Sequence, residues 1–126
     1  MWESEGLGGE DILWASTAFN GGIGGQQEAP CGVISSATVC LGFRYRCSSE
    51  DKEKAKQCRN DARRDASEFV QGFKDKFGAI TCLELLGVSF SDTERYQKLR
   101  ESGAQRGKCD SYIIYAIEKL YELANR

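Results

Sequence analysis

Apolar residues recur every three or four positions through most of the chain, and no segment alternates apolar and polar residues as a half-buried strand does. The spacing is clearest in residues 50–76, where Ala55, Ala62, Phe69 and Phe73 fall on one helical face. Further helices are expected at residues 10–19, 31–43, 81–86, 92–101 and 110–124. The pattern predicts an all-α fold, a small helical bundle that forms one domain over residues 1–126.

The segment from Cys31 to Phe43 differs from the other expected helices because it is apolar on nearly every side. A helix of this kind is buried among others, so we expect it to be the central helix of the bundle. Capping signals mark the shorter helices that follow. Thr81 with Glu84, and Ser91 with Glu94, have the spacing of capping boxes, and Gly87 and Gly103 stand where these two helices should stop.

The charge pattern gives no sign of a nucleic-acid or membrane partner. The net charge is −2, and positive and negative residues interleave. No apolar run reaches the roughly 18 residues of a membrane span, and no signal peptide opens the chain, so a cytoplasmic protein is expected. The charged run from Lys52 to Arg64 is interpreted as a solvated helix face.

Six cysteines and no histidine set the available chemistry. Without histidine, a Cys-His or Ser-His nucleophile is excluded, and so is the C-x-x-C-H attachment of haem. No C-x-x-C pair occurs either, which disfavours a zinc ribbon or a thioredoxin-type motif. The cysteines are therefore interpreted as reduced thiols, metal ligands or redox groups rather than as a secreted disulfide framework.

Three of the cysteines, Cys31, Cys82 and Cys109, are expected within about one residue of a helix start. Cys31 follows Pro30, Cys82 follows the capping residue Thr81, and Cys109 precedes Asp110, a residue type that caps helices. A helix N-terminus offers unpaired N–H groups and a partial positive charge, which favour the thiolate, the form that reacts and binds metals. These three are the candidate redox thiols and the candidate metal ligands.

The other cysteines, Cys40, Cys47 and Cys58, are interpreted as structural. Cys40 lies in the middle of the central helix, opposite in phase to Cys31, and Cys58 lies on the apolar stripe of the long helix. Cys47 follows the central helix and is the hardest of the three to assign.

The glycine-rich loop reads Asn-Gly-Gly-Ile-Gly-Gly at residues 20–25. It is not a dinucleotide-binding fingerprint, because no strand precedes it and its third glycine is misplaced. Tight backbone turns that bring a helix close to Cys31 are the favoured interpretation. A weaker alternative is a cofactor-binding nest of N–H groups at Gly22, Gly24 and Gly25.

Taken together, these segments resemble the redox-active family named for its C_GCAxxG_C_C cysteine pattern. The resemblance covers roughly residues 10–123 and depends on the glycine loop with Cys31-Gly32, on Phe77-Gly78 with Cys82 and Gly87, and on Cys109. It implies a small helical protein with a redox role, and it admits an iron–sulfur cluster or another metal as cofactor, but no haem.

The first family cysteine belongs on a helix that would precede this chain. Residues 1–7 resemble the tail of that helix, so the chain is interpreted as an N-terminally shortened member, with Cys31, Cys82 and Cys109 as the remaining family cysteines. A cluster with four thiolate ligands would then need a ligand from elsewhere.

Two functions are consistent with these observations. In the first, the three cysteines meet and either hold an iron–sulfur cluster or exchange electrons as thiols and disulfide. In the second, the chain is a non-catalytic helical interaction module in which the cysteines are relics. Whether the protein is an enzyme, and what its redox partner is, stay open. A homodimer formed through the N-terminal segment, near Trp14 and Phe19, is expected.

Overall fold

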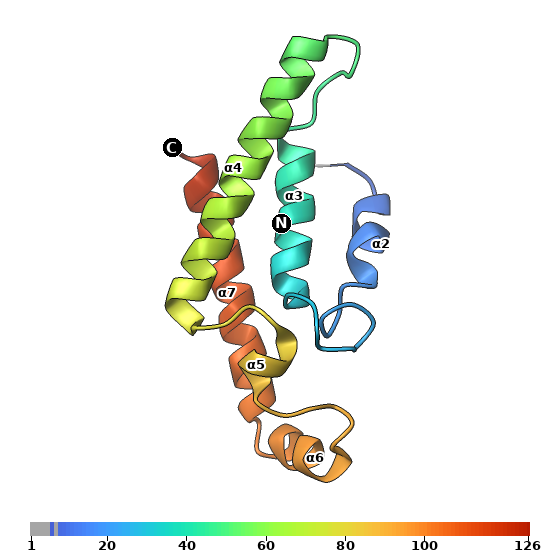
Figure 1. Ribbon diagram of the computed structural model, residues 1–126, viewed down its shortest axis with the longest axis vertical. Coiled ribbons are helices and arrows are strands. Elements are labelled where there is room, and N and C mark those ends of the chain that lie inside the picture. The colour runs from blue at the N-terminus through green and yellow to red at the C-terminus, as the bar shows by residue number, and fades with distance from the viewer. Residues whose placement is uncertain (1–5, 7) are drawn as a thin grey trace.

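The computed structural model describes residue 6 and residues 8–126, and its regular elements there are helices (Figure 1). They are α2 (Asp11–Thr17), α3 (Gly32–Arg44), α4 (Lys52–Phe77), α5 (Cys82–Leu86), α6 (Thr93–Glu101) and α7 (Ala104–Ala124). Within these residues the only β-type pairing is an isolated bridge between Pro30 and Thr81. The predicted all-α bundle is therefore confirmed. The expected tail of a preceding helix, residues 1–7, lies outside the described residues except for Gly6.

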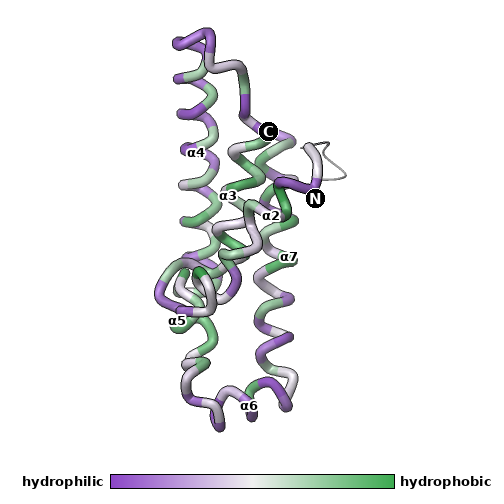
Figure 2. Tube along the Cα trace, turned by 90° about the vertical axis from the view of Figure 1, so that its right-hand side faces the viewer, coloured by the Kyte–Doolittle hydropathy of each residue, from purple (hydrophilic) through white to green (hydrophobic). Residues whose placement is uncertain are grey.

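The central position predicted for the helix that begins near Cys31 is confirmed. α3 packs against α2, α4 and α7, and its residues Ile34, Ala37 and Leu41 are buried. Figure 1 shows α3 between the short α2 and the long pair α4 and α7. Figure 2 shows hydrophobic stretches where α2, α3 and α7 lie in the middle of the molecule, whereas the first turns of α4 are largely hydrophilic.

Aromatic side chains fill the interface between α4 and α7. Phe69 and Phe73 are fully buried, and the ring of Phe73 lies 5.5 Å from that of Tyr112 and 5.6 Å from that of Tyr115. Burying a phenylalanine contributes roughly 1.5–3 kcal/mol to folding, and such ring pairs add to it. These contacts hold α7 along α4. They thereby fix the position of each α7 residue along the axis of α3.

A buried carboxylate fixes the other end of the bundle. The side chain of Asp65 on α4 is wholly buried and accepts hydrogen bonds from Tyr45, Arg64 and Arg126. These hydrogen bonds lower the pKa of Asp65, although burial acts in the opposite direction. The end of α3, the middle of α4 and the C-terminus are joined at this point.

Two expected helix boundaries were wrong. The last helix begins at Ala104 rather than near Asp110, because Gly103 in the left-handed conformation already turns the chain and Gly107 continues the helix. A glycine inside a helix costs only about 1 kcal/mol, and the added turns pack against α6. In α6, Asp92 rather than Ser91 is the capping residue, and its side chain accepts a hydrogen bond from the N–H of Arg95.

Within residue 6 and residues 8–126, every helix is too short or too polar to cross a membrane.

Candidate functional site: a cavity lined by cysteines

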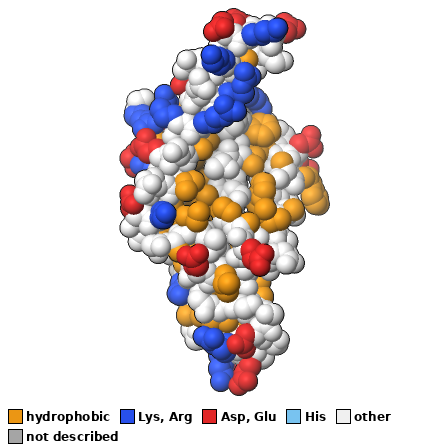
Figure 3. Space-filling view, viewed as in Figure 1, with side chains coloured by type: hydrophobic (Ala, Val, Ile, Leu, Met, Phe, Trp, Pro, Cys, Tyr) orange, Lys and Arg blue, Asp and Glu red, His pale blue; other side chains and the backbone are white. Residues whose placement is uncertain are grey.

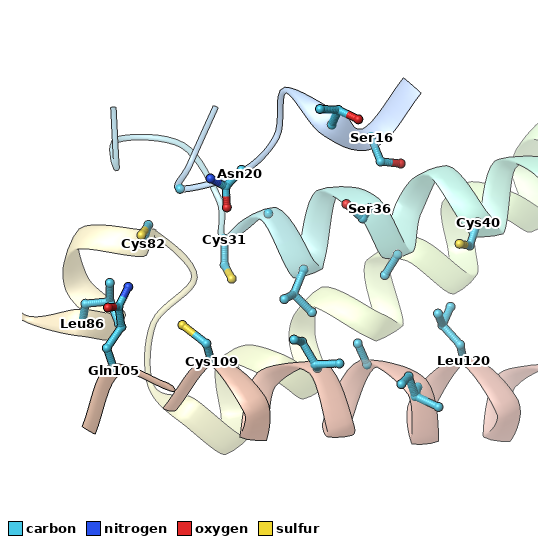
Figure 4. A pocket seen from close by; sticks show the side chains of 18 of the residues that line it. Ser16, Asn20, Cys31, Ser36, Cys40, Cys82, Leu86, Gln105, Cys109 and Leu120 are labelled. Atoms are coloured by element: carbon cyan, nitrogen blue, oxygen red, sulfur yellow. The ribbon is translucent and has the colours of Figure 1, made fainter. Parts of the chain in front are cut away.

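A cavity of about 460 Å³ lies between α2, α3, α5 and α7. Among the residues that the structure describes, four cysteines line this cavity, namely Cys31, Cys40, Cys82 and Cys109. No charged side chain of a described residue lines it. The rest of the wall is largely apolar and comes mainly from α3 and α7. Figure 4 shows Cys31, Cys82 and Cys109 grouped at one end, with Cys40 farther along α3. All three candidate cysteines therefore face the same space.

Cys31 is fixed at the start of α3 by backbone pairing. It is the N-cap residue, and its φ of −46° and ψ of 136° are not helical. Its N–H donates to the carbonyl of Ile80 at 2.7 Å, next to the bridge between Pro30 and Thr81. Residues directly opposite in such a bridge have Cα atoms about 4.5–5.5 Å apart. The pairing therefore brings Cys31 and Cys82 together although 50 residues separate them in the chain.

Cys82 is the first residue of α5, as the sequence predicts. The hydroxyl of Thr81 accepts a hydrogen bond from the N–H of Glu84 at 3.3 Å, which caps this five-residue helix. The Cys82 side chain is buried, and its sulfur accepts a hydrogen bond from the side-chain amide of Gln27 at 3.8 Å.

Gln27 is a site residue that the sequence analysis missed. It is only 3% exposed and has a positive φ of 63°. Its Nε2 also donates to the carbonyl of Val88 at 3.0 Å, and its Oε1 accepts from the N–H of Phe90 at 2.7 Å. A glutamine in a glycine-rich loop gives no signal of this role. Gln27 connects that loop to both ends of α5 and holds the wall of the cavity around Cys82.

Cys109 does not lie at a helix start, so that prediction was wrong. It is the sixth residue of α7, because the helix begins at Ala104. Its position depends instead on its neighbours: Lys108 Nζ and the Tyr112 hydroxyl both donate to the carbonyl of Leu85 at 3.4 Å. These contacts hold this part of α7 against the end of α5. Cys109 therefore reaches the cavity through helix packing rather than capping.

The electrostatics of the three thiols also differ from expectation. Burial raises the pKa of Cys31 above its ordinary value of 9.0, although the nearby N–H groups of Val33 and Ile34 act in the opposite direction without forming a capping hydrogen bond. Burial likewise raises the pKa values of Cys82 and Cys109. The helix-start effect was expected to favour thiolates, but desolvation is the stronger effect here. The structure favours protonated thiols at neutral pH.

The pKa directions also show that the three thiols are electrostatically coupled. A negative charge on Cys31 raises the pKa of Cys82 and that of Cys109. A charge on Cys82 raises the pKa of Cys109 as well. The three thiols are thus coupled pairwise, and ionisation of one opposes ionisation of the other two.

Cys40 packs against the hydrophobic core, as the sequence analysis assigned it, and also lines the cavity. Helical spacing from Cys31 predicts that Cys40 lies on the opposite face of the helix. This prediction does not apply, because Cys31 lies outside the helical backbone of α3. Nine residues separate the two, which is about 13 Å along a helix. Cys40 is therefore a lining residue at the far end of the cavity.

Cys47 and Cys58 form a disulfide, with Cα atoms 6.6 Å apart. The sequence analysis treated both as structural but did not pair them, and it placed Cys58 on the apolar stripe of the long helix. The connection between α3 and α4 turns back along α4, which brings Cys47 onto the helix beside Cys58. This pair contributes nothing to the wall of the cysteine cavity.

The glycine loop serves as a set of tight turns. Gly22, Gly24 and Gly25 all have positive φ, and the N–H groups of Gly24 and Gly25 donate to the carbonyls of Ala18 and Asn20. A Cβ on Gly22 would lie 2.9 Å from the carbonyl oxygen of Ala29. With these donors engaged inside the loop, the geometry favours the turn interpretation over a cofactor nest.

The positions of the possible donor side chains indicate whether they could hold a metal ion. Within the described residues, no three Cys, His, Asp or Glu side chains are gathered closely enough to hold one ion. Cys31, Cys82 and Cys109 line a shared cavity without forming a preformed ligand set.

Comparison with known proteins identifies the family of the chain. No curated protein and no solved structure matches the chain. One family model does, "Putative redox-active protein (C_GCAxxG_C_C)", over residues 2–123. The match covers nearly the whole chain and extends the resemblance found in the sequence from residue 10 to residue 2. The chain belongs to the C_GCAxxG_C_C family of redox-active proteins.

Proposed function

We propose that this protein carries out thiol–disulfide exchange through Cys31, Cys82 and Cys109. One observation carries the proposal: three cysteines from α3, α5 and α7 line one end of one cavity. Residues 31, 82 and 109 are far apart in the chain, and separate backbone and helix contacts bring each of them there. Structural cysteines have no reason to converge in this way.

The chemistry is a two-electron exchange with a disulfide on a partner molecule. Two protein thiols become one protein disulfide, and the partner disulfide is reduced to two thiols, so that both protons and both electrons pass to the partner. Cys31 is expected as one member of the pair, because backbone pairing holds it near Cys82 while its side chain also faces Cys109. In Figure 4 the side chains of Cys31 and Cys109 point toward one another.

The raised pKa values define the resting state of the site. At neutral pH the reduced form holds its protons, so attack on a partner requires one thiol to ionise first. Because the first charge disfavours a second, one thiol at a time acts as the nucleophile. The uncharged wall selects partners that bring no charged group into the cavity.

An iron–sulfur cluster is the alternative within the same redox role. It would need Cys31, Cys82 and Cys109 to move together and a fourth ligand from elsewhere. Visible absorbance and iron content of anaerobically purified protein test this alternative. Stoichiometric iron would favour a cluster over thiol exchange.

Exposed apolar side chains favour the second candidate function, an interaction module. Trp14 on α2 is 74% exposed, and Ile113 and Ile117, which line the cavity, are 44% and 41% exposed. Large exposed apolar side chains beside a cavity often bind a partner. Such a surface is compatible with the redox role, since a partner protein could bring its disulfide to this opening.

A redox titration of single variants separates the two functions. The protein is equilibrated with mixtures of reduced and oxidised dithiothreitol, and each cysteine is followed by alkylation and mass spectrometry. The wild type is expected to show two thiol–disulfide couples, one in the cysteine cavity and one at Cys47–Cys58. Cys31→Ser should lose the cavity couple and keep the Cys47–Cys58 couple. Cys40→Ser is the matched control and keeps both. A Cys31→Ser protein with both couples would contradict the exchange function.

A further inference from the structure

A second hollow, of about 290 Å³, lies beside the Cys47–Cys58 disulfide and is separate from the cysteine cavity. Both cysteines of the disulfide line it, together with three arginines, Arg46, Arg59 and Arg63. Among the described residues that line it, none is acidic. The disulfide thus forms one wall of an electropositive hollow.

Acidic side chains lie near the hollow without lining it: Glu50, Asp51 and Glu53 flank the start of α4, and Asp61 and Asp65 lie farther along the helix. Arg64, which does not line the hollow, binds both Asp61 and Asp65. Arg59 and Arg63 are exposed, and neither forms an ion pair with a residue in the described part of the chain. Figure 3 shows Lys and Arg side chains toward the end of the molecule where α4 begins, with Asp and Glu side chains at its tip.

The disulfide itself is within reach of a small molecule. Cys47 and Cys58 are half-buried rather than enclosed, and Arg46 and Arg59 are their immediate chain neighbours. Opening the bond would release only the link between the α3–α4 connection and α4. The core between α4 and α7 contains neither cysteine, so opening the bond removes no core contact.

We propose that Cys47–Cys58 is a second thiol–disulfide exchange site, specific for small anionic thiols that the arginines attract. A thiolate of the small molecule attacks one sulfur, forms a mixed disulfide and displaces the other cysteine as a thiolate. A second small thiol attacks the mixed disulfide. Overall, two small thiols become one small disulfide, and Cys47 and Cys58 take up their two protons and two electrons.

Charge explains the specificity. The attacking species is always a thiolate, so the positive hollow assists every thiol to some degree. A second negative group on the same small molecule adds to its attraction to the arginines. A positive group on the molecule offsets the attraction of its thiolate. Oriented positive charge of this kind raises the rate of encounter and weakens as salt is added.

The test measures how fast three probe thiols open the disulfide in the full-length protein. The probes are 2-mercaptoethanesulfonate, 2-mercaptoethanol and cysteamine, whose thiolate forms carry net charges of −2, −1 and 0. Opening is followed by alkylation and peptide mass spectrometry of residues 47 and 58. Each rate is compared between the wild type and the double variant Arg59→Gln/Arg63→Gln, so the intrinsic reactivity of each thiol cancels.

The wild-type to variant rate ratio is expected at about tenfold for the sulfonate, about threefold for mercaptoethanol and near one for cysteamine at low salt. In 1 M NaCl, all three ratios should fall toward one. The double variant Lys52→Gln/Lys56→Gln, which removes two positive charges from α4 outside the hollow, is the matched control and should keep the wild-type rates.

Equal ratios for all three thiols would overturn the proposal, and so would ratios that do not change with salt. A disulfide that none of the probes opens in the folded protein would overturn it as well. Unchanged helical circular dichroism in both double variants ensures that a lost ratio reflects charge and not unfolding.

Discussion

The side-chain amide of Gln27 donates a hydrogen bond to the sulfur of Cys82 at 3.8 Å, across 55 residues of sequence. This contact links the glycine-rich loop to the first residue of α5. It also lowers the pKa of Cys82, against the larger effect of burial. Gln27 is therefore the residue through which the loop affects both the position and the ionisation of a candidate redox thiol.

Replacing Gln27 should destabilise the protein. Gln27→Ala leaves the half-buried carbonyl of Val88 and the half-buried N–H of Phe90 without their partners, at about 1–2 kcal/mol for each group. Urea denaturation should therefore show a loss of roughly 2–4 kcal/mol. Gln26→Ala, at the exposed neighbouring position, is the control and should change stability by less than about 0.5 kcal/mol. Equal stability of the two variants would refute the assigned role of Gln27.

The start of α3 should be intolerant of a methyl group at Gly32. A Cβ there would lie 2.7 Å from the carbonyl oxygen of Phe19, a backbone atom that cannot move aside alone. Gly32→Ala should cost about 1–3 kcal/mol and should shift the neighbouring Cys31. Gly42→Ala in the same helix meets nothing within 4 Å and should stabilise by about 0.5–1 kcal/mol. Thermal unfolding should show a lower melting temperature for Gly32→Ala and a higher one for Gly42→Ala than for the wild type.

The alkylation rates of the cavity thiols should continue to rise above pH 9. Because burial raises the pKa values of Cys31, Cys82 and Cys109, each thiol stays protonated to higher pH than an exposed thiol. Reaction with iodoacetamide, followed at each cysteine by mass spectrometry, should therefore increase with pH beyond the ordinary thiol value of 9.0. A cysteine peptide should level off near that value. A plateau near pH 7 for any of the three would show that the helix-start effect exceeds desolvation.

The homodimer expected from the sequence stays a prediction. Trp14 and Ile114 are 74% and 56% exposed, so apolar surface is available on α2 and α7. Sedimentation equilibrium should give twice the chain mass of 14.0 kDa at high concentration. Trp14→Lys should shift the protein toward the monomer, whereas Leu83→Lys on α5 should not. A wild-type protein that stays monomeric at millimolar concentration would rule the dimer out.

Local signals in the sequence were sufficient for most of the fold. Thr81 and Gly87 fix both ends of α5, and the all-round apolar character of the segment after Cys31 identifies the central helix. The start of α7 could not be found in this way. Gly107 and Asp110 have the residue types of a helix boundary, but the turn at Gly103 and packing against α6 determine the observed start.

The candidate site was only partly predictable for a related reason. Chemical type alone identified Cys31, Cys82 and Cys109, yet what joins them is tertiary: the pairing at Pro30 and Thr81, and the packing of α7 on α5. The ionisation state depends on burial, which a single sequence does not give.

Disulfide mapping of the wild-type protein shows whether Cys31, Cys82 and Cys109 can exchange electrons with one another. The reduced protein is oxidised anaerobically with a small excess of a disulfide reagent, and the linked peptides are identified by mass spectrometry. A second disulfide is expected besides Cys47–Cys58, with Cys31 as one partner and Cys109 or Cys82 as the other. If Cys47–Cys58 forms while Cys31, Cys82 and Cys109 all remain thiols, the three cysteines do not exchange electrons with one another, and the proposed function is contradicted.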